Sequence, residues 1–220
     1  MMSVRERFDL DIQAVQNQML ELCNMSISAL QRSYQALMEQ DLDLALEIIE
    51  DDSELNHIEE EINDKVILLI AKQQPVATDL RRLMVITKAA SDMERVGDYA
   101  VNIAKETIRI GKEPLIFPMT NFESMCQKAI QMLEGIVEAF VHEDTTKAKE
   151  IADLDDYVDD LYGATVELLI RKAGENPEAI KQITHLSFIC RYLERSADHA
   201  TNIAEHLFYL VKGRHYELNA

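Results

Sequence analysis

The fold is decided by the stretch Glu94-Arg95-Val96-Gly97-Asp98-Tyr99-Ala100-Val101-Asn102-Ile103-Ala104, which returns as Glu194-Arg195-Ser196-Ala197-Asp198-His199-Ala200-Thr201-Asn202-Ile203-Ala204. The offset between the two copies is 100 residues, from position 94 to position 194. The Glu, Arg, Asp, Ala, Asn, Ile and Ala residues recur in register without a gap. An internal repeat of this length indicates two copies of one structural unit.

Each copy carries a strip of oxygen-bearing side chains along one face of a predicted helix. Glu94 and Asp98 stand one helical turn apart, and Asn102 follows one turn later. Apolar and small residues surround each glutamate at alternating steps of three and four, and such a position normally faces a partner helix. A charge near the end of a bundle that reaches solvent through its flexible stem is the alternative. The second copy carries the same strip on Glu194, Asp198 and Asn202.

Composition indicates a helical protein that binds cations more readily than nucleic acid. The 220 residues are 47% hydrophobic, with six Gly, four Pro and no Trp, which is typical of helices. The net charge is −18, from 22 basic and 40 acidic residues, whereas binding to nucleic acid requires clustered Lys and Arg. We therefore expect no nucleic-acid partner.

Cysteine usage and hydropathy indicate a soluble cytoplasmic protein. Cys23, Cys126 and Cys190 are widely spaced in apolar surroundings, so we expect buried thiols in a reducing compartment and no zinc site on them. No stretch approaches 18 uninterrupted apolar residues, and the first residues lead into an amphipathic segment. We expect no direct insertion into a membrane.

Apolar spacing predicts an all-α protein with six long antiparallel helices, arranged as two tandem three-helix bundles related by a pseudo-twofold axis. The predicted domains are residues 1–113 and 118–220, joined by the linker Lys112–Pro118. Capping boxes at Ser3–Glu6 and Thr120–Glu123 are expected to start the first and fourth helices, and Pro75 is expected in the first turn of the third. The six helices are predicted at Ser3 to Gln40, Asp41 to Gln74, Pro75 to Gly111, Thr120 to His142, Thr145 to Ala173, and Asn176 to Lys212.

The second helix of each copy supplies a second polar strip. Asp52 and Asn56 correspond to Asp155 and Asp159 at an offset of 103 residues. In an antiparallel hairpin that turns near Pro75, residues equally far from the turn face each other, and Asn56 and Glu94 are both 19 residues away from it. The two strips of each copy are therefore predicted to meet. The candidate metal ligands are Asp52, Asn56, Glu94 and Asp98 in the first copy, and Asp155, Asp159, Glu194 and Asp198 in the second.

Clustered carboxylates require a neutralising partner. Two of them at about 4 Å repel by about 1 kcal/mol in water and by about 4 kcal/mol at an effective dielectric constant of 20. Protons, basic side chains or a metal ion relieve this repulsion, and oxygen ligands favour Mg²⁺, Mn²⁺, Fe or Ca²⁺. Arg95 and Arg195 are the alternative, since they could neutralise the clusters without an ion. The amide of Asn56 lowers the charge of the first cluster, so we expect the second cluster to bind metal more strongly.

The stretch Gln73-Gln74-Pro75-Val76-Ala77-Thr78-Asp79-Leu80-Arg81, together with the repeated Glu-Arg-x-x-Asp motif, resembles the PhoU family of phosphate-signalling proteins. The resemblance covers nearly the whole chain. It implies a cytoplasmic negative regulator of phosphate uptake and of the Pho regulon, with the Pst phosphate ABC transporter and a PhoR-type sensor kinase as partners. A homodimer is also expected.

The family resemblance also implies multinuclear metal sites on Glu/Asp-x-x-x-Asp motifs. Iron is the metal that the family indicates first, with Mn, Mg, Zn or Ca as the other candidates. The amide of Asn56 departs from the family pattern. The matching pairs are Glu94 with Asp98, Asp155 with Asp159, and Glu194 with Asp198.

Two other functions compete with this interpretation. A ferritin-like di-metal oxidase requires Glu-x-x-His on two helices, and only Glu54–His57 has that spacing. A purely structural helical interaction module would use the acidic strips as solvated faces. No nucleophile–base pair or glycine-rich phosphate loop is present, so we expect no enzymatic activity and no catalytic residue. Surface positions are expected for the histidines at 57, 142, 185, 199, 206 and 215, which share no repeated motif position.

Overall fold

The computed structural model describes residues 4–218 and contains helices with no strand in that range. The expectation of an all-α protein is confirmed. None of the helices in this range combines the length and the apolar composition needed to cross a membrane. The helices are α1 (Val4–Glu39), α2 (Leu42–Gln73), α3 (Ala77–Ile110), α4 (Thr120–His142), α5 (Thr145–Ala152), α6 (Asp155–Glu175) and α7 (Ile180–Lys212), with a short 3₁₀ turn at Pro177–Ala179.

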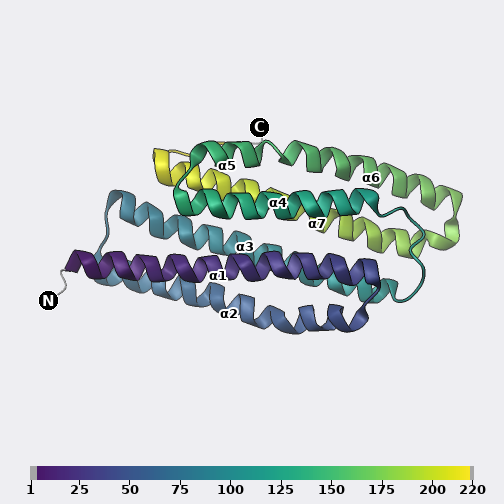
Figure 1. Ribbon diagram of the computed structural model, residues 1–220, viewed down its shortest axis with the longest axis horizontal. Helices are drawn as coiled ribbons and strands as arrows, with labels where there is room; N and C mark the ends of the chain where they lie inside the picture. The colour runs from purple at the N-terminus through teal and green to yellow at the C-terminus, as the bar shows by residue number, and fades with distance from the viewer. Residues whose placement is uncertain (1–3, 219–220) are drawn as a thin grey trace.

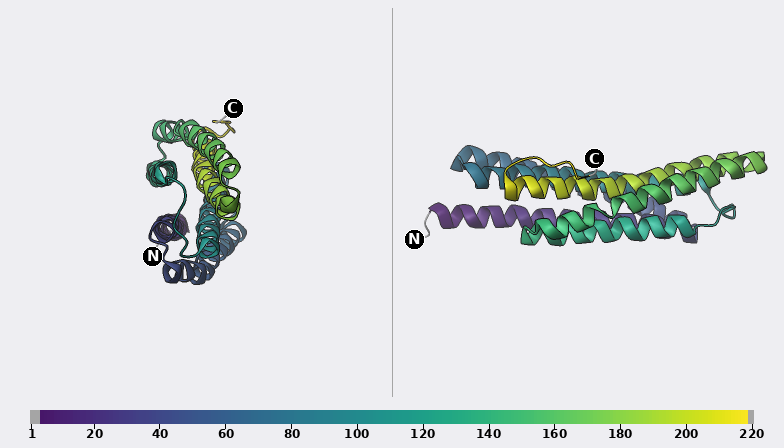
Figure 2. Two further views of the ribbon diagram at one scale, coloured as in Figure 1. Left: turned by 90° about the vertical axis from the view of Figure 1, so that its right-hand side faces the viewer. Right: turned by 90° about the horizontal axis from the view of Figure 1, so that it is seen from above.

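The helices form two antiparallel bundles that lie side by side in an elongated molecule (Figure 1). One bundle contains α1, α2 and α3, and the other contains α4, α5 with α6, and α7. Seen along the long axis, the two bundles meet where α3 packs against α7 (Figure 2). The predicted pair of three-helix bundles is therefore confirmed, while the domain limits 1–113 and 118–220 stay a prediction.

The fifth predicted helix, Thr145 to Ala173, consists of two helices with a break at Asp153 and Leu154. The backbone N–H of Leu154 donates to the carbonyl of Ile151 at 3.1 Å, and that of Tyr157 donates to Leu154 at 3.2 Å. These i→i+3 bonds tighten the chain locally, and a new helix starts at Asp155. As a result, Asp155 lies in the first turn of α6, where the helix dipole favours a negative charge.

The helix starts differ from two of the predicted caps. Helix α4 starts after Met119 without a side-chain cap, so the capping box predicted at Thr120 is wrong, and Ser3 lies outside the described residues. Pro75 lies between helices, not in the first turn of α3, because left-handed Gln74 ends α2 and extended Val76 precedes α3. Proline disfavours a right-handed helical conformation in the residue before it, which accounts for this separation.

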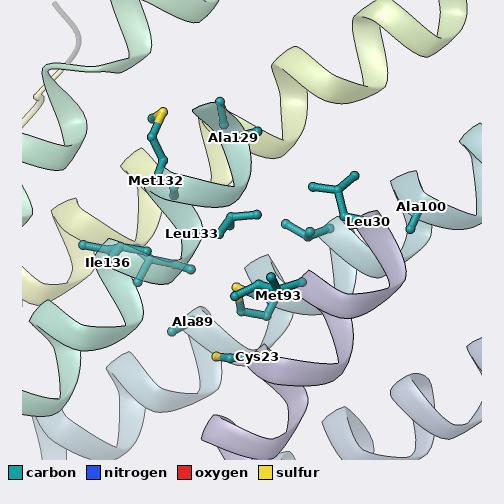
Figure 3. Close-up of a cluster of buried hydrophobic side chains, with 14 of the residues drawn as sticks. Cys23, Leu30, Ala89, Met93, Ala100, Ala129, Met132, Leu133 and Ile136 are labelled. Carbon is teal, nitrogen blue, oxygen red and sulfur yellow. The ribbon is translucent and has the colours of Figure 1, made fainter. Parts of the chain in front are cut away.

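The main apolar core runs through both bundles, and a smaller separate cluster lies within the first bundle. Met93 of α3 and Leu133 of α4 are fully buried beside Cys23 of α1, in the cluster that Figure 3 shows. The three cysteines are buried and free, as expected, and burial raises the pKa of Cys23 to about 12. Because residues of both repeats belong to the main cluster, the two bundles share most of their apolar core.

The contact between α3 and α7 follows the pseudo-twofold axis. The rings of Tyr99 and Tyr192 stack with centroids 5.9 Å apart, and Nδ1 of His199 lies 2.7 Å from Oδ1 of Asp92. The two contacts are equivalent under the repeat. Position 99 corresponds to position 199, and position 192 corresponds to position 92. Tyr99 and His199 are equivalent to each other, and their ring centroids are 5.6 Å apart, which places this pair at the axis.

Three histidines expected on the surface lie in this contact, so that expectation is wrong for them. His199 is buried and His206 is half-buried, and both contact Asp92. Nδ1 of His185 lies 2.6 Å from Oε2 of the buried Glu106. Each histidine finds its carboxylate on the other repeat, and these long-range pairs leave no local pattern in the sequence. Burial of polar groups in such pairs is tolerated because each carboxylate receives a hydrogen bond or an ion-pair partner.

Truncation of Leu133 tests whether the core is shared. We expect Leu133→Ala to lower the free energy of unfolding by about 2–5 kcal/mol, because it opens a cavity between the bundles. Unfolding followed by circular dichroism in a denaturant titration should remain one cooperative transition. Leu10→Ala, at an exposed position on α1, is the control and should change stability by less than about 0.5 kcal/mol. Two separate transitions in the wild type would contradict a shared core.

Candidate metal centre

Three carboxylates of the second repeat converge between α6 and α7. Asp159 of α6 and Glu194 and Asp198 of α7 each offer one oxygen, and these oxygens lie within 4.8 Å of one another. Glu194 is buried, Asp198 is half-buried and Asp159 is exposed. We call Asp159, Glu194 and Asp198 the second-repeat cluster.

Helical geometry accounts for this convergence. Glu194 and Asp198 are four residues apart on α7 and therefore share one face of that helix. Helix α6 packs antiparallel against α7 and brings Asp159 to the same level. The cluster is thus held by two regular helices, and its spacing follows from the backbone.

Glu194 is the most perturbed member of the second-repeat cluster. Burial and then the neighbouring charge of Asp198 raise its pKa to about 7, although Arg191 opposes the shift. Arg191 donates to Oε1 of Glu194, whereas Oε2 is buried and accepts no hydrogen bond from the described residues. Burial, followed by Asp198, also raises the pKa of Asp159. An oxygen that is buried without a partner and surrounded by other carboxylates is a fitting ligand for a cation.

The first repeat brings its polar strips together more loosely. Nδ2 of Asn56 donates to Oδ2 of Asp52 at 3.3 Å, and both side chains are half-buried on α2. The pKa of Asp52 and that of Glu94 are raised by burial and then by the charge of Asp98, so α2 and α3 do place these strips near each other. Among residues 4–218, only the second repeat gathers ligand atoms of three His, Cys, Asp or Glu side chains within 4.8 Å of one another.

The two arginines of the repeated motif behave differently. Arg95 stays on its own strip, with Nη1 3.0 Å from Oδ2 of Asp98 and Nε 3.7 Å from Oε2 of Glu94. Arg195 instead donates from Nε to the hydroxyl of Tyr99 at 2.7 Å, across the contact between α3 and α7. The counterion of the first strip is therefore the arginine of the motif itself, whereas in the second strip Arg195 points to the other bundle and Arg191 pairs with Glu194.

Asp155, the remaining predicted ligand, is buried at the start of α6. It lies one turn before Asp159 and does not belong to the trio of oxygens within 4.8 Å. Its role as a ligand stays a prediction, as do those of the other seven predicted residues.

The sequence did not point to two residues that decide which arginine lies beside the second strip. Arg191 pairs with Glu194, and Tyr99 accepts the hydrogen bond of Arg195. A signal for Arg191 exists, since it precedes Glu194 by three residues and the equivalent position of the first repeat is Ser91. Tyr99 carries no such signal, because its bond to Arg195 joins the two repeats.

The ferritin-like motif does not lie inside a bundle. Glu54 and His57 are both exposed on α2, and Nε2 of His57 lies 3.2 Å from Oε1 of Glu61, one turn along the same helix. An oxidase centre requires such a pair to project into the interior. The geometry therefore does not favour this alternative.

Comparison with known proteins identifies relatives along the whole length. A family profile described as the PhoU domain matches residues 19–107 and again residues 122–207. The phosphate-specific transport system accessory protein PhoU homolog of Clostridium acetobutylicum is 35% identical over 216 residues, which cover 98% of this chain and 99% of the relative.

Two solved structures share the fold. The crystal structure of PhoU from Pseudomonas aeruginosa superposes with a TM-score of 0.91 at 29% identity, over 94% of this chain and 100% of that one. The crystal structure of the phosphate transport system regulatory protein PhoU from Streptococcus pneumoniae gives a TM-score of 0.89 at 29% identity, over 96% of this chain and 99% of that one. Relatives described as accessory and regulatory proteins agree with the expectation that the chain is not an enzyme.

The raised pKa of Glu194 predicts a pH dependence of stability in the presence of a chelator. A carboxyl group whose folded pKa is about 7 contributes stability fully below its ordinary pKa of 4.5 and loses it as the pH rises through about 7. Glu194→Gln should therefore gain stability relative to the wild type as the pH rises from about 5 to about 8. Chemical denaturation at several pH values measures this difference.

Glu60→Gln, on the exposed face of α2, is the matched control and should follow the wild-type profile. Parallel pH profiles for the wild type and Glu194→Gln would show that the Glu194 carboxyl group titrates alike in the folded and unfolded chains.

Proposed function

Because this chain belongs to the PhoU family, we propose that it serves as an accessory and regulatory protein of a phosphate-specific transport system. The observation that carries the proposal is the double match of the PhoU domain, which falls on α1 to α3 and again on α4 to α7. The duplicated Glu-Arg-x-x-Asp strips lie inside both matched ranges. The proposal concerns regulation through binding, and it assigns no reaction to the chain.

We further propose that the protein limits phosphate uptake by the Pst ABC transporter and represses the Pho regulon through a PhoR-type sensor kinase. Both partners come from the family resemblance. Action on the cytoplasmic side of the membrane and assembly as a homodimer belong to the same proposal. A long rod of two bundles supports it, because such a rod offers extended helical faces to protein partners.

For the acidic strips we propose a role as cation sites. Asp159, Glu194 and Asp198 would hold the ion in the second repeat, with Asp155 one turn away as a further oxygen donor. Carboxylate oxygens are suitable ligands for iron, and also for Mn²⁺, Mg²⁺ and Ca²⁺. Iron is the metal that the family resemblance favours.

The first repeat would bind a cation more weakly. The amide of Asn56 removes one negative charge, and Arg95 already neutralises part of Glu94 and Asp98. The single observation that supports an ordered pair of sites is the convergence of Asp159, Glu194 and Asp198 within 4.8 Å in the second repeat.

A thermal-shift titration with Mn²⁺ tests the cation sites. We expect the wild type to melt at a higher temperature in Mn²⁺, because an ion at about 100 times its Kd stabilises the folded state by about 2.7 kcal/mol. The Glu194→Gln, Asp198→Asn variant should lose most of this shift while remaining at least as stable as the wild type without metal.

The matched control is Glu94→Gln, Asp98→Asn in the first repeat, which should keep most of the shift. The variant Asn56→Asp should bind Mn²⁺ more tightly in the first repeat and be less stable without it. If all three variants and the wild type shift equally, the strips are salt-bridged structural features.

Deletion of the gene tests the regulatory proposal. We expect the deletion strain to express phosphate-starvation genes in high phosphate and to accumulate more phosphate, and a plasmid copy of the wild type should reverse both effects. Uptake of labelled phosphate and a reporter for the Pho regulon measure the two outputs. Unchanged uptake and reporter expression at both high and low phosphate would count against the proposal.

A further inference from the structure

The end of the first bundle has a charge opposite to that of the chain as a whole. Residues 65–88, which contain the turn between α2 and α3, carry five basic residues and one acid, a net charge of +4 in a chain of net charge −18. The single acid, Asp79, pairs with Arg5 of α1. The basic residues are Lys65, Lys72, Arg81, Arg82 and Lys88.

The same segment exposes large apolar side chains. Ile67 is 64% exposed, Leu68 is 50% exposed and Val76, in the turn itself, is 74% exposed. Leu80 and Met84 are also exposed on the first turns of α3. Single exposed apolar residues are ordinary, whereas several of them gathered with charges of one sign are typical of a binding surface.

A groove of about 600 Å³ lies between α1 and α2 at this end. Val15, Leu68 and Leu69 supply its apolar wall, while Arg7 and Lys72 supply basic groups. Neither Arg7 nor Lys72 makes an ion pair with any residue from 4 to 218, so both charges are available to a ligand. Lys65 also lines the groove but pairs with Glu61, and Asp11 is the one acid in the lining. Grooves of about 300–1,000 Å³ are large enough to bind ligands.

The second repeat does not reproduce this chemistry. At the offset of 103 that relates α2 to α6, Lys65 corresponds to Leu168, Leu68 to Arg171 and Lys72 to Glu175. The basic and apolar lining is therefore not a consequence of the bundle fold. It belongs to the first repeat alone.

We propose that this groove binds an amphipathic helix of a partner protein, with an apolar ridge flanked by Asp and Glu residues. A concave groove between two helices accepts the convex ridge of a third, and leucine-type side chains spaced by three and four residues would reach Val15 and Leu68. The acidic flanks would meet Arg7 and Lys72. The inference concerns a different surface from the acidic strips and needs neither a metal ion nor phosphate.

Two other occupants fit the groove less well. A bilayer is flat and cannot enter a groove, and an anionic lipid surface would repel the remainder of this acidic chain. A second copy of the chain joined through the same surface would place one basic patch against another, because a twofold interface brings a patch onto itself. Charge complementarity therefore favours an acidic helix.

Direct binding to a designed peptide tests this proposal. The probe is a stapled, fluorescently labelled helix of about 20 residues with leucines on one face and glutamates on both flanks, and its matched partner carries lysines in place of the glutamates. We expect the full-length protein to bind the glutamate peptide roughly tenfold more tightly than the lysine peptide in fluorescence anisotropy. The preference should weaken as salt is added.

Variants then assign the binding to the groove. Arg7→Glu, Lys72→Glu should reverse the preference between the two peptides, and Leu68→Ser should weaken both. The control variants on α6, Lys172→Glu and Ile170→Ser, should leave binding unchanged, and melting curves should show that all variants fold. Equal binding of both peptides, or binding that Leu68→Ser leaves intact, would overturn the proposal.

The same variants separate the other occupants. Sedimentation of the wild type with anionic vesicles, lost on Arg7→Glu, Lys72→Glu, would reassign the groove to lipid and overturn the proposal. Self-association of the wild type that those changes abolish would reassign it to a second copy and overturn it as well. Reassignment of the groove to lipid or to a second copy would not change the result of the metal titration or the phosphate phenotype. Failure of the groove proposal is therefore distinguishable from failure of the proposed function.

Discussion

The antiparallel packing of α3 against α7 is the contact on which the rest of the structure depends. One face of each helix joins the other bundle through Tyr99 and Tyr192 and through Asp92 and His199. Another face of the same two helices presents the acidic strips to α2 and α6. Because the contact and the strips share one short motif, the register of α3 against α7 fixes the position of both strips.

This packing also accounts for the different arginine partners of two nearly identical strips. The hydroxyl of Tyr99 accepts a hydrogen bond from Arg195, which turns that guanidinium toward the other bundle. In the second repeat, His199 occupies the position that corresponds to Tyr99. Arg95, the counterpart of Arg195, lies beside Glu94 and Asp98 of its own strip. In the second strip Arg191 is the counterion of Glu194, yet three carboxylate oxygens lie within 4.8 Å of one another and Oε2 of Glu194 is buried without a hydrogen bond from the described residues. Burial and then the charge of Asp198 raise the pKa of Glu194 to about 7, and we propose that a bound cation relieves this strain on the carboxylate.

The sequence alone predicts the duplication, the order of the long helices and the approach of the two polar strips. These features follow from apolar residues spaced by three to four positions and from the repeat at an offset of 100 residues. The sequence does not reveal the break before Asp155, which comes from local i→i+3 bonds that no proline or glycine announces. Nor does it reveal the partners of His185, His199 and His206, since each partner lies on the other repeat. The expectation for Pro75 is wrong for a local reason, because left-handed Gln74 precedes it and extended Val76 follows it, so α3 starts only at Ala77.

Anomalous diffraction from crystals grown with Mn²⁺ or iron measures the central claim most directly, namely that the second repeat is the stronger cation site because three of its carboxylates converge. The account predicts a strong anomalous peak in contact with Asp159, Glu194 and Asp198 and a weaker one beside Asp52, Glu94 and Asp98. A stronger peak in the first repeat, or none in the second, would contradict it.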